Sequence, residues 1–121
     1  MKLLITGGCG FIGSAVVRHL IATTDWQIAN IDKLTYAGNL RNLASLDGDA
    51  RHVFVRGDIG DAGLVGRLLA EHRVRAVVHF AAETHVDRSI KDGYSFVRTN
   101  CFGTNVLCDV AMRVGVQRFL H

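Results

Sequence analysis

The chain has 121 residues, of which 49% are hydrophobic and 21% charged, a balance typical of one globular domain with its own core. The net charge is +3 and the sequence pI is about 9.0, but the basic residues are spread from Lys2 to Arg118 and form no run. Because nucleic acids and anionic membranes are bound by clustered cations, we expect neither as a partner. No apolar stretch reaches the length of a membrane span or a signal peptide.

The apolar residues alternate between short strand-like runs and helical periodicity along the whole chain. Strands are expected at residues 2–6, 27–31, 52–56, 75–81 and 117–121, and helices at residues 11–22, 40–46, 62–72 and 95–114. The stripe expected to pack on the sheet contains Ile12, Val16, Val17 and Leu20 in the first helix, and Phe96, Phe102, Val106, Val110 and Val114 in the last.

Strict alternation of strands and helices predicts an α/β fold, a Rossmann-type doubly wound parallel sheet truncated to about five strands. Right-handed crossovers predict the strand order 3-2-1-4-5, with the first two helices on one face and the next two on the other. The direction of winding then reverses between the first and fourth strands, where such folds bind ligands.

The cysteines Cys9, Cys101 and Cys108 show neither a C-x-x-C pair nor the spacing of zinc ligands. We therefore expect no metal site and no disulfide framework, as in a protein of the reducing cytoplasm. Cys101 and Cys108 lie seven residues apart in an apolar helical pattern, which predicts that both thiols are buried.

A glycine-rich segment, Thr6-Gly7-Gly8-Cys9-Gly10-Phe11-Ile12-Gly13, joins the first strand to the first helix. It matches G-x-G-x-x-G in the strand–loop–helix context that dinucleotide-binding proteins require. Gly7 and Gly8 permit the tight turn, Gly10 lets a pyrophosphate approach the backbone, and Gly13 allows close packing. Free N–H groups at the helix start would then hold the anion, so the sequence predicts a dinucleotide site.

Two carboxylates follow the second and third strands. Asp32 lies nineteen residues after Gly13, where a carboxylate accepts hydrogen bonds from the ribose of NAD and repels a 2′-phosphate. The adjacent Lys33 could pair with such a phosphate, so NADP stays an alternative. Asp58 could accept a hydrogen bond from adenine or, equally, cap the following helix.

Three segments together resemble the dTDP-glucose 4,6-dehydratases, which belong to the extended short-chain dehydrogenases/reductases. These are the glycine segment, Asn30-Ile31-Asp32-Lys33-Leu34-Thr35-Tyr36-Ala37-Gly38-Asn39-Leu40, and His79-Phe80-Ala81-Ala82-Glu83-Thr84-His85-Val86-Asp87-Arg88-Ser89-Ile90. The resemblance continues through Phe96-Val97-Arg98-Thr99-Asn100 and covers the whole chain. It implies that residues 1–121 are the amino-terminal part of an NAD-binding Rossmann domain.

The resemblance also implies a set of residues around NAD. They are Gly7, Gly10, Phe11, Ile12 and Gly13 of the loop, Asp32, Lys33, Leu34 and Thr35 near the ribose, Asp58 and Ile59 near the adenine, and Phe80, Ala81, Ala82, Glu83, Thr84 and Thr99 along the cofactor. Thr84 stands where the family has a serine that touches both cofactor and sugar, so we expect it to contact the substrate as well. Asp92-Gly93-Tyr94 replaces a usual Gly-Pro, which alters the start of the next helix.

The family converts dTDP-glucose to a 4-keto-6-deoxy sugar by oxidation at C4, elimination of water across C5–C6 and return of the hydride. Its acid–base groups, a Thr-Asp-Glu segment and a Tyr-x-x-x-Lys pair, are not found within residues 1–121. The resemblance therefore implies a fragment without catalytic residues, drawn from a cytoplasmic, homodimeric enzyme. Without further strands, Val78, Phe80 and Phe119 are expected to expose part of their surface and to favour non-specific association.

Two other functions stay open at this point. One is a different nucleotide-sugar enzyme, an epimerase or decarboxylase, against which the Ala82–Ser89 segment argues. The other is a non-catalytic dinucleotide-binding module. A hydrolase triad built from His85, Asp87 and Ser89 is disfavoured because no nucleophile elbow or oxyanion motif accompanies them.

Overall fold

The computed structural model describes all residues from 1 to 121 and contains one five-stranded sheet in the order β3-β2-β1-β4-β5. Every neighbouring pair of strands is parallel. The predicted strand order and fold class are therefore confirmed. The strands are β1 (Lys2–Thr6), β2 (Gln27–Asp32), β3 (His52–Arg56), β4 (Ala76–His79) and β5 (Arg118–Leu120).

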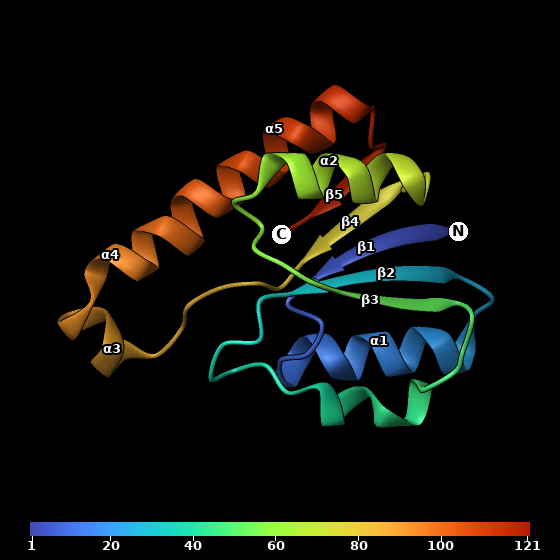
Figure 1. Cartoon of the computed structure of the whole chain (residues 1–121), viewed down its shortest axis with the longest axis horizontal. Helices are drawn as coiled ribbons and strands as arrows, with labels where there is room; N and C mark the ends of the chain where they lie inside the picture. The colour runs from blue at the N-terminus through green and yellow to red at the C-terminus, as the bar shows by residue number, and fades with distance from the viewer.

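Helices cover both faces of this sheet (Figure 1). One face carries α1 (Phe11–Thr23) and the 3-10 helix η1 (Leu40–Leu46), and the other carries α2 (Ala62–Glu71) and α5 (Thr104–Val114). Alternate residues of β1 enter two separate cores, because Leu4 packs toward α2 and α5 whereas Ile5 packs toward α1. Burial on both faces explains why the central strands are almost continuously apolar.

The expected long helix over residues 95–114 is instead three consecutive segments. They are α4 (Gly93–Phe96), a π-helical segment η2 (Val97–Gly103), and α5. A π-helical turn holds more residues than an α-helical turn, so the 3.6-residue stripe does not continue through η2. Val110 is buried as expected, but Phe102 and Val114 are 52% and 41% exposed, so that part of the predicted stripe is wrong.

The expected burial of Ile12, Cys101 and Cys108 is also wrong. Ile12, in the first turn of α1, is 62% exposed, whereas Val17 is buried as expected and Ile21, which was not in the expected stripe, is buried as well. Cys101 and Cys108 are exposed because the faces of η2 and α5 that carry them turn away from the core, and only Cys9 is buried. A short helix α3 (Val86–Lys91), which the periodicity did not indicate, precedes α4.

At the β5 side of the sheet, Val78, Phe80 and Phe119 are each partly buried, as expected. Val78 and Phe80 pack toward α1, whereas Phe119 packs on the face that α2 and α5 cover. Leu120 in β5 is 64% exposed. Apolar surface is therefore left accessible at this edge of the sheet. None of the helices combines the length and the apolar character that spanning a membrane requires.

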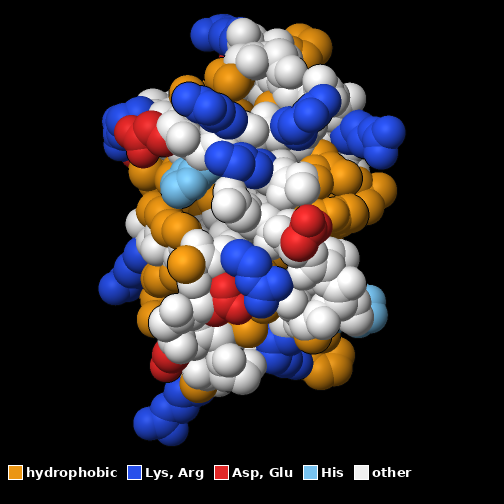
Figure 2. All heavy atoms as spheres, turned by 90° about the vertical axis from the view of Figure 1, so that its right-hand side faces the viewer, with side chains coloured by type: hydrophobic (Ala, Val, Ile, Leu, Met, Phe, Trp, Pro, Cys, Tyr) orange, Lys and Arg blue, Asp and Glu red, His pale blue; other side chains and the backbone are white.

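The amino-terminal ends of the strands form a face on which several Lys and Arg side chains are visible (Figure 2). The exposed Arg75 and Arg118 lie where β4 and β5 begin, and Arg75 donates a hydrogen bond of 3.0 Å to Gln117.

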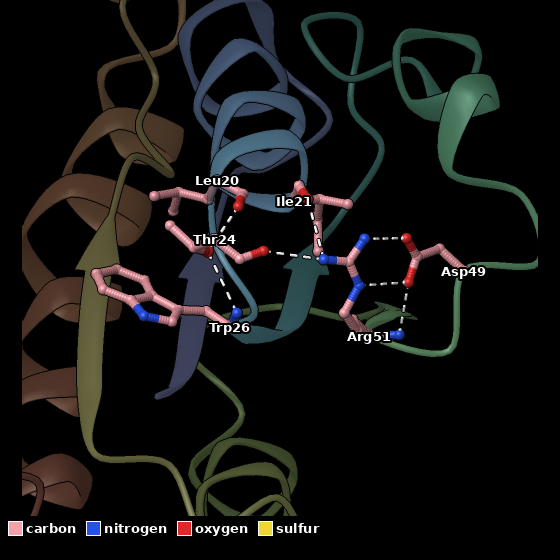
Figure 3. Close-up of polar contacts among 6 residues, drawn as sticks. All are labelled: Leu20, Ile21, Thr24, Trp26, Asp49 and Arg51. Carbon is pink, nitrogen blue, oxygen red and sulfur yellow. Dashed lines mark hydrogen bonds and ion pairs between the residues drawn. The ribbon is translucent and has the colours of Figure 1, made fainter.

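On this same side of the molecule, Arg51 closes the carboxyl end of α1 (Figure 3). One Arg51 Nη donates to the carbonyl oxygens of Ile21 at 3.0 Å and Thr24 at 2.9 Å. The guanidinium also forms a paired contact with Asp49, at 3.1 and 2.7 Å. A cation at this position satisfies carbonyls that the helix leaves free and complements the negative end of its dipole.

Candidate functional site

A cleft opens at the carboxyl ends of β1, β2, β3 and β4, at the point where the winding of the sheet reverses. Its lining consists of Gly7, Gly10, Ile31, Asp32, Lys33, Thr35, Ala37, Gly38, Gly57, Asp58, Ile59, Phe80, Ala81, Ala82, Glu83 and Thr99. Parallel strands bring their following loops to one edge, so residues from four separate parts of the sequence meet there.

The glycine loop forms one side of the cleft, and two of its glycines cannot be replaced without a shift of the backbone. Gly7 has φ +69°, and a Cβ on it would lie 2.7 Å from the backbone nitrogen of Ala81. A Cβ on Gly13 would overlap the carbonyl oxygen of Gly7. The loop, the start of α1 and the segment after β4 are therefore packed backbone to backbone.

The amino end of α1 begins at Gly10, and no side chain caps it and no acidic residue lies in its first turn. The first N–H groups of a helix have no partner within the helix, and the helix dipole adds positive potential at this end. Because Gly10 lines the cleft, these features meet the requirements for binding an anion such as a pyrophosphate.

Asp32 ends β2 and is only 9% exposed, at the wall of the cleft. Its Oδ2 accepts a hydrogen bond from the backbone N–H of Cys9 at 2.8 Å, and its Oδ1 accepts one from the N–H of Leu34 at 2.8 Å. Each carboxylate oxygen keeps a second lone pair. Asp32 therefore anchors two loops, as a simple cap at the end of a strand would. It also retains free acceptors for the hydroxyl groups of a ligand.

The backbone of Cys9 connects the glycine loop with the loop that follows β2. Its N–H donates to Asp32, and its carbonyl oxygen accepts from the Asn39 N–H at 3.0 Å and from Asn42 Nδ2 at 2.9 Å. Burial, assisted by the negative charge of Asp32, raises the pKa of the Cys9 thiol to about 11. Cys9 is thus a buried, unreactive thiol whose main contribution is its backbone.

Lys33 and Asp58 form an ion pair of 2.8 Å on the wall of the cleft. Burial opposes ionisation of Asp58, but hydrogen bonds from Lys33 and the Gly60 N–H, with the charges of Lys33 and Arg98, hold the pKa of Asp58 below its ordinary value. The side chain that caps α2 is Asp61, which accepts from the Leu64 N–H at 2.9 Å. The helix-cap alternative for Asp58 is therefore wrong, and Lys33 is already paired with a carboxylate.

A buried polar chain supports the segment after β4. The Thr6 hydroxyl oxygen accepts a hydrogen bond from the Ala81 N–H at 3.2 Å and lies 2.6 Å from His79 Nδ1. His79 Nε2 lies 2.9 Å from the Thr104 hydroxyl. Burial, together with the neighbouring His121, lowers the pKa of His79 to about 4. We therefore assign a neutral imidazole that accepts from Thr6 and donates to Thr104.

The same segment is fixed from the helical side by Asn100. Asn100 Oδ1 accepts from the Glu83 N–H at 2.8 Å, and Asn100 Nδ2 donates to the Glu83 carbonyl oxygen at 2.9 Å. Asn100 belongs to η2, as does Thr99, which lines the cleft. The π-helical segment thus supplies one residue that fixes the rim and one that faces the cavity, a frequent use of such segments.

Most of the residues expected around the cofactor lie in this cleft, but five do not line it. Gly13 supports the loop from behind, and Leu34, with φ +57°, packs toward the core beneath α1. Phe11 and Ile12 border a separate hollow beside α1, with exposures of 91% and 62%. Thr84 follows Glu83 and is exposed to solvent. The contacts of these five residues with a cofactor therefore stay predictions.

Four lining residues had not been expected from the sequence: Ile31, Ala37, Gly38 and Gly57. A Cβ on Gly38 would lie 2.7 Å from Asp32 Oδ1, so the small residue lets this loop close over the carboxylate. The neighbouring small pair Ala37-Gly38, directly after the Asp32 segment, was the signal available in the sequence.

The polar residues 85–89 lie at the outer rim of the cleft and do not form a triad. Asp87, Arg88 and Ser89 belong to α3, and the Ser89 hydroxyl donates to the carbonyl oxygen of Val86 at 2.6 Å. The His85 ring lies beside Tyr36. These contacts are local and structural, which agrees with the argument against a hydrolase triad.

Known proteins resemble the chain over its whole length. A dTDP-glucose 4,6-dehydratase of Shigella flexneri is 53% identical over 111 residues, which are 92% of this chain and 31% of that protein. One from an Actinoplanes species is 54% identical and is matched over 100% of this chain and 39% of its own length. The chain thus spans about a third of the length of the curated relatives it matches.

Solved structures of nucleotide-sugar enzymes also resemble the chain over nearly its whole length. A dTDP-glucose 4,6-dehydratase of Streptomyces venezuelae, solved with NAD bound, has a TM-score of 0.94 and 51% identity, with 100% of this chain and 38% of that chain covered. A UDP-glucose 4-epimerase of Thermotoga maritima has a TM-score of 0.88 and 33% identity, with 98% and 36% covered. The family model described as GDP-mannose 4,6 dehydratase matches residues 4–121. The chain therefore belongs to the GDP-mannose 4,6 dehydratase family.

Proposed function

We propose that the chain binds NAD in the cleft at the carboxyl edge of the sheet and serves as the cofactor-binding portion of a dTDP-glucose 4,6-dehydratase. The observation that carries this proposal is the gathering of the uncapped α1 terminus, Asp32 and Asp58 around one cleft. The three dehydratases described above share 51 to 54% identity with the chain, against 33% for the epimerase, and this favours dehydration over epimerisation, although a dTDP-glucose 4,6-dehydratase of Bacillus anthracis also shares only 33%.

The residues present fit a dinucleotide. The pyrophosphate would lie against Gly10 and the first N–H groups of α1, including those of Phe11 and Ile12, where a side chain at position 10 would intrude. The adenosine ribose would hydrogen-bond the free lone pairs of Asp32, bordered by Lys33, Thr35 and the backbone of Leu34, whose side chain packs toward the core. Asp58 and Ile59 would border the adenine. The nicotinamide half would extend past Phe80, Ala81, Ala82, Glu83 and Thr99, toward the exposed Thr84.

The nicotinamide ring of a bound NAD would supply the hydride acceptor and, once reduced, the hydride donor. Within residues 1–121, the neutral His79 and Asn100 hold the rim in place, and the Thr84 hydroxyl is available to orient a sugar hydroxyl. Acid–base groups of the kind that the dehydration needs are not found among these residues. We therefore expect residues 1–121 alone to bind NAD without converting dTDP-glucose. From the resemblance alone we also propose a cytoplasmic, homodimeric full-length enzyme, with residues 1–121 forming part of its NAD-binding domain.

Titration of the chain with NAD and NADP tests the cofactor. NAD should bind more tightly, because the Asp32 carboxylate repels a 2′-phosphate. Asp32→Ala should weaken NAD binding by about 1–3 kcal/mol through loss of charge-assisted hydrogen bonds. Because Asp32 also anchors two loops, thermal unfolding of Asp32→Ala and of the surface control Asp109→Ala should be followed in parallel. Tighter binding of NADP than of NAD by the unsubstituted chain would overturn the cofactor assignment.

The dTDP-glucose assay tests the second half of the proposal. Purified chain supplied with NAD should give no 4-keto-6-deoxy product. If product forms, and Asp32→Ala or a Thr84 variant abolishes it, then residues 1–121 do contain acid–base groups sufficient for the dehydration, and this half of the proposal is overturned.

A further inference from the structure

Two loops form opposite rims of the cleft. Residues 33–39 follow β2, and residues 80–85 follow β4, and both contribute lining residues. The Tyr36 hydroxyl donates a hydrogen bond of 3.0 Å to Glu83 Oε2, which joins the two rims across 47 residues of sequence.

The Tyr36 ring makes two more contacts on the far rim. The Arg88 guanidinium carbon lies 3.8 Å from the ring centroid, in cation–π geometry, and the His85 ring centroid lies 5.5 Å away at an interplanar angle of 57°. Tyr36 is nevertheless 45% exposed. All three partners of Tyr36 lie on the segment after β4, and none of them belongs to a hydrophobic core. Tyr36 therefore connects the two rims and does not contribute to core packing.

The position of this contact relates it to the cleft. Thr35, Ala37 and Gly38, which flank Tyr36 in sequence, all line the cleft, and Glu83 lines it from the other rim. Thr35 and Glu83 also line a second hollow of about 320 Å³, together with Tyr36, Arg88 and Lys91. The Tyr36–Glu83 contact therefore lies at the boundary between the two cavities.

Glu83 is itself held from behind, because its backbone pairs with the Asn100 side chain at 2.8 and 2.9 Å. On the other side, the backbone of the loop that carries Tyr36 is anchored by the Leu34 N–H on Asp32 and the Asn39 N–H on Cys9. Tyr36 thus links two anchored loops and not two free ones.

We propose that Tyr36 is a positioning residue that ties the two rims together and thereby slows release of the bound dinucleotide. The inference rests on the proposed binding of NAD in this cleft. A ligand that lies between two rims leaves faster when the rims separate more often, so loss of the tie should raise the release rate. Lid and loop opening of this kind limits ligand exchange in many nucleotide-binding enzymes.

Hydrogen–deuterium exchange tests the tie without any ligand. Tyr36→Phe removes only the hydroxyl and keeps the ring beside Arg88 and His85, and Tyr36→Ala removes all three contacts. Backbone amides of residues 81–90 should exchange about threefold faster in Tyr36→Phe and about tenfold faster in Tyr36→Ala, as expected for loss of one and then of all three weak contacts. The control is Tyr94→Phe, since Tyr94 is 73% exposed and lines neither cavity. Unchanged exchange in Tyr36→Ala would overturn the tie.

Stopped-flow release of NADH, displaced by excess NAD and followed by its fluorescence, tests the consequence. Release should accelerate in the same order, Tyr36→Ala more than Tyr36→Phe, with Tyr94→Phe unchanged. Arg88→Gln should accelerate release, whereas Arg113→Gln, at a surface ion pair of α5, should not. Faster amide exchange in Tyr36→Ala with an unchanged rate of NADH release would overturn the proposal that Tyr36 slows release of the dinucleotide. Failure of the unsubstituted chain to bind NADH would overturn the proposed function instead, and the exchange data would still decide whether Tyr36 ties the rims.

Discussion

The two ends of α1 show how one helix can serve structure at one end and binding at the other. At the carboxyl end, Arg51 and the Thr24 hydroxyl donate hydrogen bonds to the last carbonyl oxygens, and Asp49 pairs with the Arg51 guanidinium. At the amino end, which begins at Gly10, no side chain caps the helix, and the backbone adjoins the cleft. The end whose carbonyl oxygens have these hydrogen-bond partners contributes only to stability. The end whose N–H groups have no partner within the helix can bind a ligand. The variants below test this difference between the two ends.

The largest effect is expected at the open end. Gly7→Ala forces a residue with a Cβ into φ +69° and against the Ala81 backbone. We expect a loss of about 3–5 kcal/mol of unfolding free energy from strain and overpacking, together with loss of NAD binding. Denaturant unfolding and NAD titration measure the two. Gly66→Ala is the control, because its Cβ would lie 3.6 Å from Val110 and should stabilise α2 by about 0.5–1 kcal/mol. A Gly7→Ala chain as stable as the unsubstituted one would contradict the described loop geometry.

The second prediction concerns the polar chain beneath the open end. Burial and the adjacent His121 lower the pKa of His79 from 6.5 to about 4, so the unfolded chain takes up a proton more readily than the folded one. This contribution to stability is complete above pH 6.5 and is lost as the pH falls from 6.5 to 4, by up to about 3 kcal/mol.

Denaturant unfolding across that pH range measures this decline. His79→Gln should be less stable at neutral pH but should show a shallower decline on acidification. His52, whose pKa is also lowered by burial, provides the comparison, and His52→Gln should remove a smaller part of the slope. An identical slope in His79→Gln and the unsubstituted chain would show that His79 is not the responsible group.

The third prediction tests the closed end. Arg51→Ala removes two charge-assisted hydrogen bonds to helix carbonyls and leaves Asp49 unpaired. We expect a loss of unfolding free energy that is clearly larger than in the control Arg113→Ala. NAD affinity should change less than about twofold, because the opposite end of α1 keeps its N–H groups free. Arg113→Ala, at an exposed pair with Asp109, should cost no more than about 0.5 kcal/mol. A large loss of NAD affinity in Arg51→Ala would mean that the two ends are not independent.

The smallest effect is expected for Lys33→Met at the cleft. Lys33 is already paired with Asp58, and its side chain is 53% exposed, so its removal should change NAD affinity by less than about threefold. The same variant sharpens the cofactor assignment. If Lys33 recognised a 2′-phosphate, Lys33→Met would weaken NADP binding far more than NAD binding.

The fold could be predicted from the sequence largely because local patterns determine it. Continuous apolar runs such as Leu3–Ile5 mark buried parallel strands, and the handedness of crossovers leaves few possible strand orders. The glycine segment and Asp32 could be placed at one edge for the same reason. Element ends were less accurate, since β4 covers only Ala76–His79 of the residues 75–81 expected.

Features that depend on contacts between distant side chains could not be predicted. The π-helical register of η2 changed which residues face the core, so Phe102 and Cys101 are exposed despite an apolar pattern. The pairing of Lys33 with Asp58 and the contact of Tyr36 with Glu83 join loops whose mutual placement follows only from the folded sheet. No periodicity in the sequence encodes such pairs.

The hydrogen bonds of Asp32 to Cys9 and Leu34 also determine when the binding loops lose their conformational freedom. Because both bonds join groups of the chain itself, folding can order the two loops without any contact from a ligand. A ligand that meets this preorganised acceptor loses mainly its own translational and rotational freedom. Affinity at this site is therefore set partly by folding, so a substitution far from the cleft that loosens either loop should weaken binding without removing a single ligand contact.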